Sequence, residues 1–337
     1  MTRSKSKDYD YLHANSRIWE MERLLLTADS LDRMVDYKNN EDVIKALAEY
    51  GYELRSVEKG TDELEASISA SRGRLFNELT AIAPDKRVVD IFKIKYDYHN
   101  IKVILKSSVT GDNPEPIMVN FGRFAPRNLR DRIIRDELSE FPVIMQKAIA
   151  EAKDILARTS DAQLTDVVLD RALHTEMAAI AVETRSDYLS GYVRMLIDAA
   201  NLRTLVRSAL MRKDAEFVRS SLIGGGDIKT SDIVSFGDLT ASLSEGVYQN
   251  TKFKNAAAEG LSVIESGGSL TRFEKLCDDA VTEYIRKAHS VAFGEAPLIA
   301  FLAAKEAEVT AIRTIISGRL AGVPGGEIRG RLRDTYV

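Results

Sequence analysis

Two short motifs in the chain carry residue types that could bind a phosphate or a metal ion. Gly224 to Gly226 supply the glycines of a phosphate-binding loop, but no Gly-Lys-Ser/Thr ending follows them and no strand precedes them. His174 and Glu176 match the H-x-E pair of zinc deaminases, which also need a Pro-Cys-x-x-Cys segment, and Cys277 is the only cysteine. We therefore interpret the glycines as a flexible turn and predict no zinc at the histidine.

A third candidate is the acidic group Asp278, Asp279 and Glu283, because helical prenyl-transferring enzymes bind magnesium through clustered aspartates. Asp279 and Glu283 share a helix face, but Asp278 points away from it and no second aspartate-rich segment accompanies them. A solvated helix face explains the group better. No nucleophile, base and orienting group come together elsewhere, so we predict no catalytic residue, no bound metal and no cofactor.

Five arginines gather within thirteen residues, with acids among them: Arg123, Arg127, Arg130, Arg132 and Arg135. The whole chain carries 47 basic and 51 acidic residues, a net charge of -4. Nucleic-acid binding requires basic side chains that are not paired with acidic ones, so we expect no nucleic-acid partner. A surface helix with mixed ion pairs is our first interpretation of the arginine segment, and docking onto an acidic protein is the second.

The elements that position these residues read as helices. Apolar residues recur every three or four positions, as in Ile94, Tyr98 and Ile101, and strand-type alternation is hard to find. The 337 residues are 45% hydrophobic and include only 7 prolines and 20 glycines, which is enough for two or three cores. We predict an all-α protein in which Asn40 caps an early helix and Gly51 ends it.

No stretch of the chain is apolar enough to span a membrane. The longest run without Asp, Glu, Lys or Arg is the nine residues from Ala296 to Ala304, about half of the ~20 that a membrane helix requires. The basic start, residues 1–11, leads into no apolar segment of signal-peptide type, so we expect no export. Any relation to a membrane would go through a protein partner or a surface contact.

One helical segment occurs three times: DYHNIKVILK from Asp97, DAANLRTLVR from Asp198 and EVTAIRTIIS from Glu308. The starting points lie 101 and 110 residues apart, too far for a solenoid, so each copy should belong to a unit with its own core. Periodicity alone does not explain the polar residues that fall in register, namely Asp97, Asn100 and Lys102, then Asp198, Asn201 and Arg203, then Glu308 and Arg313. We expect the two aspartates to tie each repeat helix to a neighbour by charge-assisted hydrogen bonds.

Helix breakers indicate where the repeated units join. Pro114, Pro116 and Pro126 follow the first repeat helix, and the glycines from Gly224 follow the second. We predict three similar helical-bundle units, at residues 1–110, 111–223 and 224–337.

Several segments, in order, resemble the C subunit family of bacterial and archaeal V-type (A-type) rotary ATPases, akin to the d subunit of the vacuolar enzyme. They are ANSRIWEMERLLL from Ala14, the DYHNIKVILK and DAANLRTLVR helices, GGGDI from Gly224, and the closing KEAEVTAIRTIISGRLAGVPGGEIRGRLRDTY. The likeness runs from the first predicted helix to the last residues. Ala311 departs from the pattern where the first two repeats have asparagine, so the third unit need not repeat their polar contacts.

The resemblance implies a funnel of three similar helical domains with pseudo-threefold symmetry, monomeric when isolated. Such a peripheral protein lies at the cytoplasmic face of the membrane, meets the membrane only through the proteolipid rotor ring, and holds the tip of the central shaft formed by the D and F subunits. It would transmit torque for ATP-coupled proton or sodium transport without catalytic residues of its own. The sequence does not indicate the coupling ion or the direction of working.

Two other hypotheses stay open at this point. A generic helical-repeat scaffold that binds other proteins would explain the repeats and the missing chemistry equally well. A magnesium-dependent helical enzyme that uses Asp279 is the second alternative.

Overall fold

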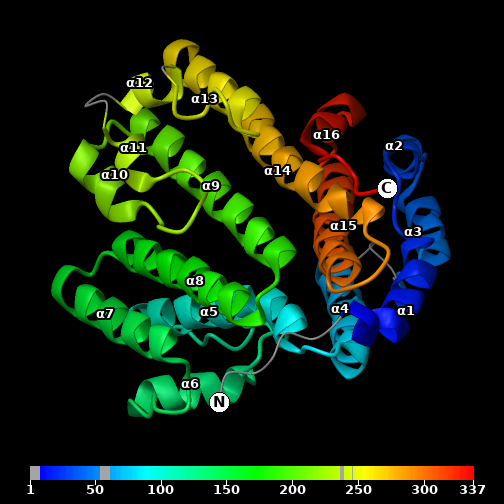
Figure 1. The fold of residues 1–337 in the computed structure, drawn as a ribbon, viewed down its shortest axis with the longest axis horizontal. Helices are drawn as coiled ribbons and strands as arrows, with labels where there is room; N and C mark the ends of the chain where they lie inside the picture. The colour runs from blue at the N-terminus through cyan, green and yellow to red at the C-terminus, as the bar shows by residue number, and fades with distance from the viewer. Residues whose placement is uncertain (1–7, 54–60, 236–238, 245) are drawn as a thin grey trace. The chain divides into compact units, whose positions relative to one another are not determined.

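The computed structural model of the chain is a set of helices (Figure 1), and it describes residues 8–53, 61–235, 239–244 and 246–337, without the side chains of residues 61 and 62. No strand occurs among these residues, which confirms the all-α prediction. The α-helices are Leu12–Glu22 (α1), Ala28–Asp36 (α2), Asn40–Glu49 (α3), Thr61–Ile82 (α4), Arg87–Thr110 (α5), Pro126–Arg135 (α6), Val143–Thr159 (α7), Ala162–Thr184 (α8), Asp187–Leu210 (α9), Ala215–Ser221 (α10), Thr230–Ile233 (α11), Leu239–Ser244 (α12), Lys254–Ser266 (α13), Thr271–Ile285 (α14), Ala296–Leu320 (α15) and Gly325–Arg331 (α16). Two 3-10 helices, Asp8–Tyr11 (η1) and Arg286–Ser290 (η2), precede α1 and follow α14.

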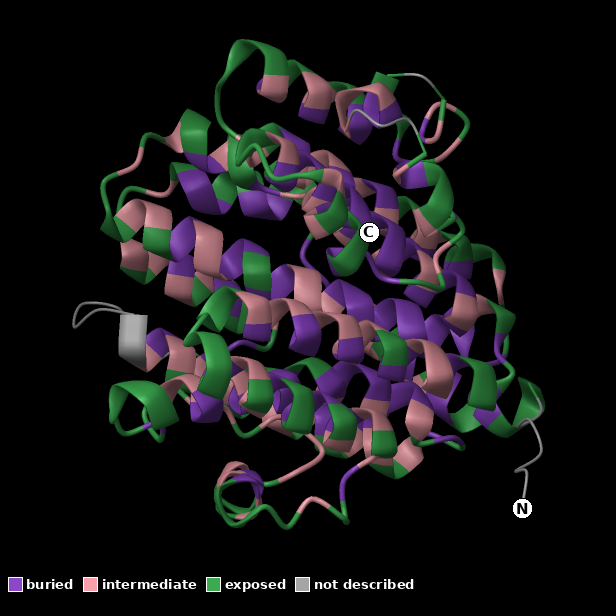
Figure 2. Ribbon diagram, turned by 90° about the vertical axis from the view of Figure 1, so that its left-hand side faces the viewer, coloured by how far each residue is buried: buried purple, intermediate pink, exposed green. Residues whose placement is uncertain are grey.

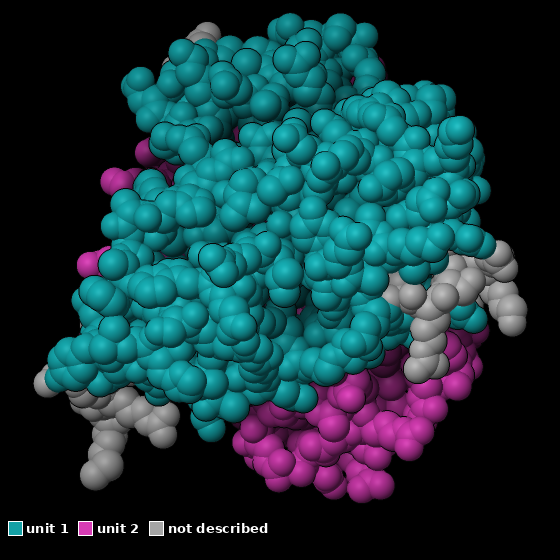
Figure 3. Space-filling view, turned by 90° about the vertical axis from the view of Figure 1, so that its right-hand side faces the viewer, with its two compact units in different colours: residues 1–89, 240–337 teal, residues 90–239 magenta. Residues whose placement is uncertain are grey.

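The chain divides into two compact units (Figure 3), one of residues 1–89 with 240–337 and one of residues 90–239. The first, unit 1, therefore combines the two ends of the sequence. Its core joins α2, α3 and α4 to α15 and α16 through buried apolar side chains such as Met34, Leu47, Ile68, Ile312 and Ile316. Burial of this kind is the main source of its stability.

Unit 2 is residues 90–239, with α5 after its first turn and α6 to α11. Here α7 and α8 pack along each other, and α8 packs on α9 (Figure 1). Buried residues follow stripes along these helices (Figure 2), among them Ile149 of α7, Leu169 of α8 and Leu205 of α9. The predicted segments 1–110, 111–223 and 224–337 have different limits, and their three-unit organisation stays a prediction.

Local signals fix several helix ends. Asn39 caps α3, because its Oδ1 accepts a hydrogen bond from the amide of Asp42 at 2.8 Å. The prediction of Asn40 was wrong by one residue: Asn39 has the extended backbone (φ -133°) that an N-cap needs, and Asn40 is already helical. After α3, Gly51 adopts φ +83°, a left-handed conformation that glycine reaches without a Cβ clash, and the helix ends there as predicted.

None of the described helices is both long enough and apolar enough to cross a membrane. Of the basic start, residues 1–11, the first seven lie outside the described residues.

Candidate functional site

Each repeat helix buries the acid that opens its repeated segment. Helices α5, α9 and α15 carry Asp97, Asp198 and Glu308, whose exposed fractions are 0%, 2% and 6%. The apolar residues beside them, such as Ile101 and Leu202, are also buried. A carboxylate is tolerated in such a place only when hydrogen-bond donors surround it, so the donors define what each acid does.

Asp97 binds the backbone of the segment that follows α5. Its Oδ1 accepts hydrogen bonds from the amides of Arg123 and Phe124, at 2.9 and 3.3 Å. Gly122 directly precedes these amides, and a Cβ atom on it would lie 2.0 Å from the same carboxylate oxygen. Only glycine allows the backbone to approach Asp97 this closely.

Asp198 repeats the arrangement after α9. Its two oxygens accept from the amides of Asp227 and Ile228, at 3.0 and 3.2 Å. Gly226 precedes them, and a Cβ atom there would lie 2.0 Å from Asp198 Oδ1. The glycine turn that resembled a phosphate loop therefore binds a carboxylate of the chain itself. Asp198 is tied to this connecting segment and not to a neighbouring helix.

The asparagine one turn after each aspartate holds a second point of the same segment. Asn100 donates to the carbonyl oxygen of Val119 at 2.8 Å and accepts from its amide at 2.9 Å. Asn201 makes the same pair with Ile223, both at 2.8 Å. A side-chain amide that pairs with both the N–H and the C=O of one residue fixes the position and the direction of that segment. We call each Asp and Asn pair with its bound segment a clamp.

The third repeat uses its acid differently, as the alanine at position 311 allowed. Glu308 accepts from the backbone amide of Leu26, from the Tyr52 hydroxyl at 2.6 Å and from Lys305 Nζ at 2.7 Å. These partners belong to unit 1, and two of them come from the N-terminal part of the chain. Glu308 thus joins α15 to the segments around α2 and α3, although some 256 residues separate it from Tyr52.

The three repeat helices also end alike. Gly111, Arg212 and Gly322 each follow the acid of their repeat by fourteen residues, and each has a left-handed backbone, with φ of 78°, 55° and 68°. Such a residue stops a helix and turns the chain. The repeated segments therefore share a backbone ending as well as their polar side chains.

Two residues before each of these turns lies an exposed aliphatic side chain. The three are Val109, Leu210 and Leu320, with exposed fractions of 56%, 38% and 40%. One exposed aliphatic residue is ordinary, but these three occupy the same position of the repeat. We call these three residues the helix-end residues.

Arg123 lies inside unit 2, so the surface interpretation was wrong for this member of the arginine segment. Its guanidinium contacts Asp97 Oδ2 and Glu176 Oε1, both at 2.7 Å, and the Tyr98 hydroxyl donates to Glu176 Oε2 at 2.9 Å. The side chain of Arg123 is 15% exposed, and the two carboxylates are almost fully buried. Two acids share one base, and the hydrogen bonds between them order this network.

The other arginines behave as a surface helix predicts. Arg130 of α6 contacts Glu115 at 3.1 Å, and Arg132 contacts Glu140 at 2.7 Å. Exposed pairs of this kind contribute little to stability.

The repeated bases extend from the repeat helices to other helices. Lys102 contacts Asp170 of α8 at 2.6 Å, and Arg313 contacts Glu65 of α4 at 2.7 Å. Arg203 is half-buried on α9. Their role as structural repeat positions remains a prediction.

Each acidic side chain of the group on α14 forms an ion pair with a lysine or an arginine. Its pairs are Asp278 with Arg333 at 2.8 Å, Asp279 with Lys275 at 2.9 Å, and Glu283 with Lys252 at 2.5 Å. Asp279 also accepts from the backbone amide of Asp334 at 2.8 Å. His174 Nδ1 contacts the carbonyl oxygen of Asp170 at 2.8 Å. Among the described residues no group of three His, Cys, Asp or Glu is arranged to hold a metal ion.

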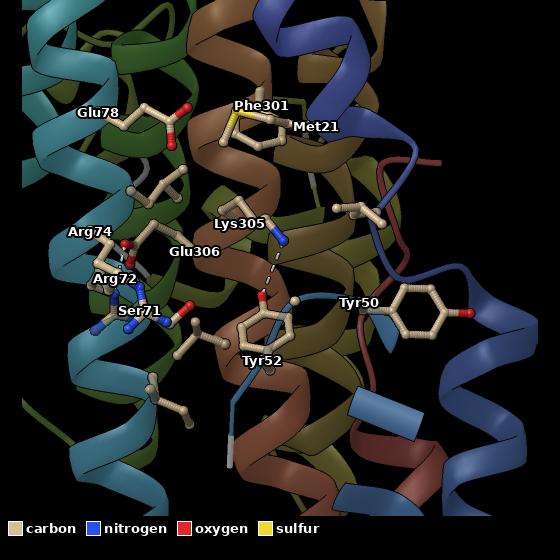
Figure 4. A pocket seen from close by; sticks show the side chains of 15 residues that line it. Met21, Tyr50, Tyr52, Ser71, Arg72, Arg74, Glu78, Phe301, Lys305 and Glu306 are labelled. Atoms are coloured by element: carbon tan, nitrogen blue, oxygen red, sulfur yellow. Dashed lines mark hydrogen bonds and ion pairs between the residues drawn. The ribbon is translucent and has the colours of Figure 1, made fainter. Parts of the chain in front are cut away.

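A cavity of about 190 Å³ lies in unit 1 between α4 and α15 (Figure 4). Its charged residues are already matched, since Arg72 contacts Glu306 at 3.2 Å and Lys305 contacts Glu308 at 2.7 Å. Lys305 also reaches the Tyr52 hydroxyl at 3.4 Å. A charged ligand would have to displace one of these pairs, so we interpret the cavity as part of the Glu308 contact.

Burial dominates the titration of both clamp aspartates. It raises the pKa of Asp97 to about 6 from the ordinary 3.8, against the opposite effect of Arg123 and the backbone amides. It raises the pKa of Asp198 to about 6 as well, again against its two backbone donors. Both carboxyls are therefore mainly ionised at pH 7 and take up protons in mildly acidic solution.

Known proteins match this chain over nearly its full length. The profile of a family described as ATP synthase (C/AC39) subunit matches residues 14–331. The chain is similar to the C subunit of the V-type sodium ATPase of Enterococcus hirae, with 26% identity over 97% of this chain and 99% of the relative. It is also similar to the C subunits of the A-type ATP synthases of Methanocaldococcus jannaschii and Thermococcus kodakarensis, each 24% identical, over 96% and 91% of this chain and 86% of each relative.

We predict that Asp198→Ala destabilises the protein by about 1 to 3 kcal/mol at pH 7, because the amides of Asp227 and Ile228 are left without an acceptor. Chemical denaturation with circular dichroism measures the change. Asp154→Ala is the matched control, since Asp154 is an exposed aspartate of α7, and its effect should stay within about 0.5 kcal/mol. Equal denaturation midpoints for the two variants would mean that the Asp198 carboxylate contributes no more to stability than a solvent-exposed aspartate.

The destabilisation caused by Asp198→Ala should grow as the pH falls. The pKa of Asp198 is raised on folding, so its titration stabilises the native protein fully below pH 3.8 and loses this effect as the pH rises through 6. Between pH 8 and pH 5 the difference between wild type and variant should increase by about 1 kcal/mol. Denaturation curves at several pH values test the sign, and a difference that shrinks toward pH 5 contradicts it.

Gly226→Ala should destabilise by about 2 kcal/mol or more, because the added methyl group overlaps the Asp198 carboxylate. Gly224→Ala is the control, since a Cβ atom there meets nothing within 4 Å. Thermal unfolding of the two variants gives the comparison. Similar melting temperatures would show that the turn moves aside without cost.

Proposed function

The chain belongs to the ATP synthase (C/AC39) subunit family and is a peripheral, non-catalytic subunit of a rotary V/A-type ATPase, and we propose that it is the central-stalk connector. In this role it joins the central shaft, formed by the D and F subunits, to the membrane proteolipid ring at the cytoplasmic face. It transmits torque between them for ATP-coupled proton or sodium transport. The observation that carries the proposal is the family match over residues 14–331, which includes all three repeat helices.

The clamps support a mechanical role. Each repeat helix is tied by a buried acid to another part of its unit. Asp97 and Asp198 bind the segment that follows their helix, and Glu308 binds Leu26 and Tyr52, which are distant in sequence. Such contacts make helix rotation costly, because turning the helix exposes an unpaired charge to an apolar core. A part that passes torque needs this resistance, and close-packed helices provide it.

The helix-end residues support attachment to a ring. A ring of identical proteolipids presents the same surface many times, so a connector can meet it with equivalent contacts from equivalent repeats. Exposed aliphatic side chains at one repeat position suit such contacts, since they gain free energy when an apolar surface covers them. We propose that Val109, Leu210 and Leu320 contact the proteolipid ring, and that the predicted three units provide this repetition.

Binding assays with purified partners test the function. The full chain should form a stoichiometric complex with D and F subunits in solution and should bind detergent-solubilised proteolipid rings. Size-exclusion chromatography with light scattering measures both. A chain that stays monomeric beside both partners would favour a generic helical scaffold instead.

Replacing the helix-end residues tests the mode of attachment. Each of Val109→Ser, Leu210→Ser and Leu320→Ser should weaken ring binding about fivefold, as expected for about 1 kcal/mol of lost apolar burial, and the triple variant should multiply these losses. Val182→Ser is the control, because Val182 of α8 is 71% exposed but stands outside this repeat position. Binding to D and F should not change. Loss confined to one of the three sites would contradict equivalent contacts.

A further inference from the structure

Unit 1 has a second cavity, of about 280 Å³, that the connector function does not use. Trp19 and Glu22 of α1 line one side of it. His289 of η2 and Tyr336 of the C-terminal segment contribute two more rings. The cavity therefore combines three aromatic rings and one carboxylate.

The cavity walls are ordered by contacts within unit 1. Trp19 and Glu22 stand three residues apart on α1, and therefore on one face. The rings of His289 and Tyr336 stack at 4.3 Å with an angle of 19° between them, and His289 Nε2 contacts the carbonyl oxygen of Tyr336 at 3.2 Å. Lys275 holds the preceding Asp334 at 2.9 Å. The rings of His289 and Tyr336 are thus held in place by contacts within unit 1.

The lining of the cavity includes the titratable side chains of Glu22, His289 and Tyr336. Glu22 is its only charged carboxylate, and no lysine or arginine is among its lining residues. The nearby Arg286 donates to the carbonyl oxygen of Thr335 at 3.0 Å, and Lys287 lies over the ring of Tyr284 at 4.4 Å. Helix α1 ends at Glu22, so the negative end of its dipole lies at the same place. The cavity between α4 and α15 differs, because its charges are matched by lysine and arginine.

Burial acts on Glu22 in a consistent way. It raises the pKa of the carboxyl above its ordinary value, while a hydrogen bond from the Tyr336 hydroxyl and the charge of His289 act in the opposite direction. A carboxylate that has lost part of its hydration is stabilised by a cation that takes the place of the lost water.

We propose that this cavity binds a cationic group of the ammonium or guanidinium type, held by the Glu22 carboxylate and by the face of Trp19. Aromatic rings attract such cations through their negative faces, and a carboxylate supplies a charge-assisted hydrogen bond. The volume of about 280 Å³ lies below the range of drug-sized pockets and suits one side chain or one end of an amine. An arginine or lysine side chain of a protein and a free polyamine share this chemistry.

Trp19 gives a direct readout, because it is the only tryptophan of the chain and is 45% exposed. The full-length protein is titrated with ethylguanidinium at constant ionic strength, and its tryptophan fluorescence is recorded. We expect a saturable change at millimolar concentration. Ethylurea, a neutral analogue of the same shape, should bind at least tenfold more weakly. No saturable change, or equal changes with both compounds, overturns the proposal without any variant.

Variants identify the residue that is responsible. Glu22→Gln should weaken ethylguanidinium binding at least tenfold, whereas Glu20→Gln should leave it unchanged, since Glu20 is exposed and pairs with Arg17. Unaltered binding to Glu22→Gln places the cation elsewhere and overturns the assignment. Titration with N-acetylarginine amide and with spermidine then distinguishes the two sources. The compound that binds more tightly indicates whether a protein side chain or a polyamine is the natural ligand.

Discussion

A carboxylate that is buried among apolar helices must find donors, and this requirement explains much of the chain. Asp97 and Asp198 each accept hydrogen bonds from two consecutive backbone amides. Each pair of amides directly follows a glycine at which a Cβ atom would overlap the carboxylate. The acid determines where the connecting segment runs, and the segment makes the buried acid tolerable. Helix and connection are therefore specified together, so that neither can change alone. The same demand is met in the third repeat by residues from the other end of the sequence, with Glu308 as the acceptor.

The buried charges of the described residues suit a structural role. The buried acids of the repeat helices are held by donors of the chain itself, Asp97 by Arg123 and backbone amides, and Asp198 by backbone amides. A catalytic group needs a perturbed pKa and an open approach for a substrate. Here the perturbed carboxyls of Asp97 and Asp198 are sealed by their own backbone partners. Perturbation without access indicates a structural use of charge, which agrees with a non-catalytic family.

Sequence patterns predicted the helical class and the buried stripe with Ile101, because period and polarity are local properties. They did not predict Gly122, since a lone glycine before Arg123 carries no signal until Asp97 is seen beside it. Nor did they show that unit 1 contains both ends of the chain, because contacts between residues 26 and 308 depend on tertiary structure. The error at Arg123 has the same origin. A cluster of arginines in a sequence is typical of an exposed helix, and only the fold shows that Arg123 pairs with the buried Glu176.

The contact of Glu308 with Leu26 and Tyr52 has a consequence for biosynthesis. A ribosome releases α1 to α4 first and α15 almost last, so the core of unit 1 lacks Ile312 and Ile316 during most of translation. Residues 90–239 emerge as one continuous stretch and need no later partner from the nascent polypeptide to complete their own packing. The N-terminal helices wait with exposed apolar faces in the meantime. We therefore expect chaperones to act on this N-terminal part of the nascent chain more than on residues 90–239.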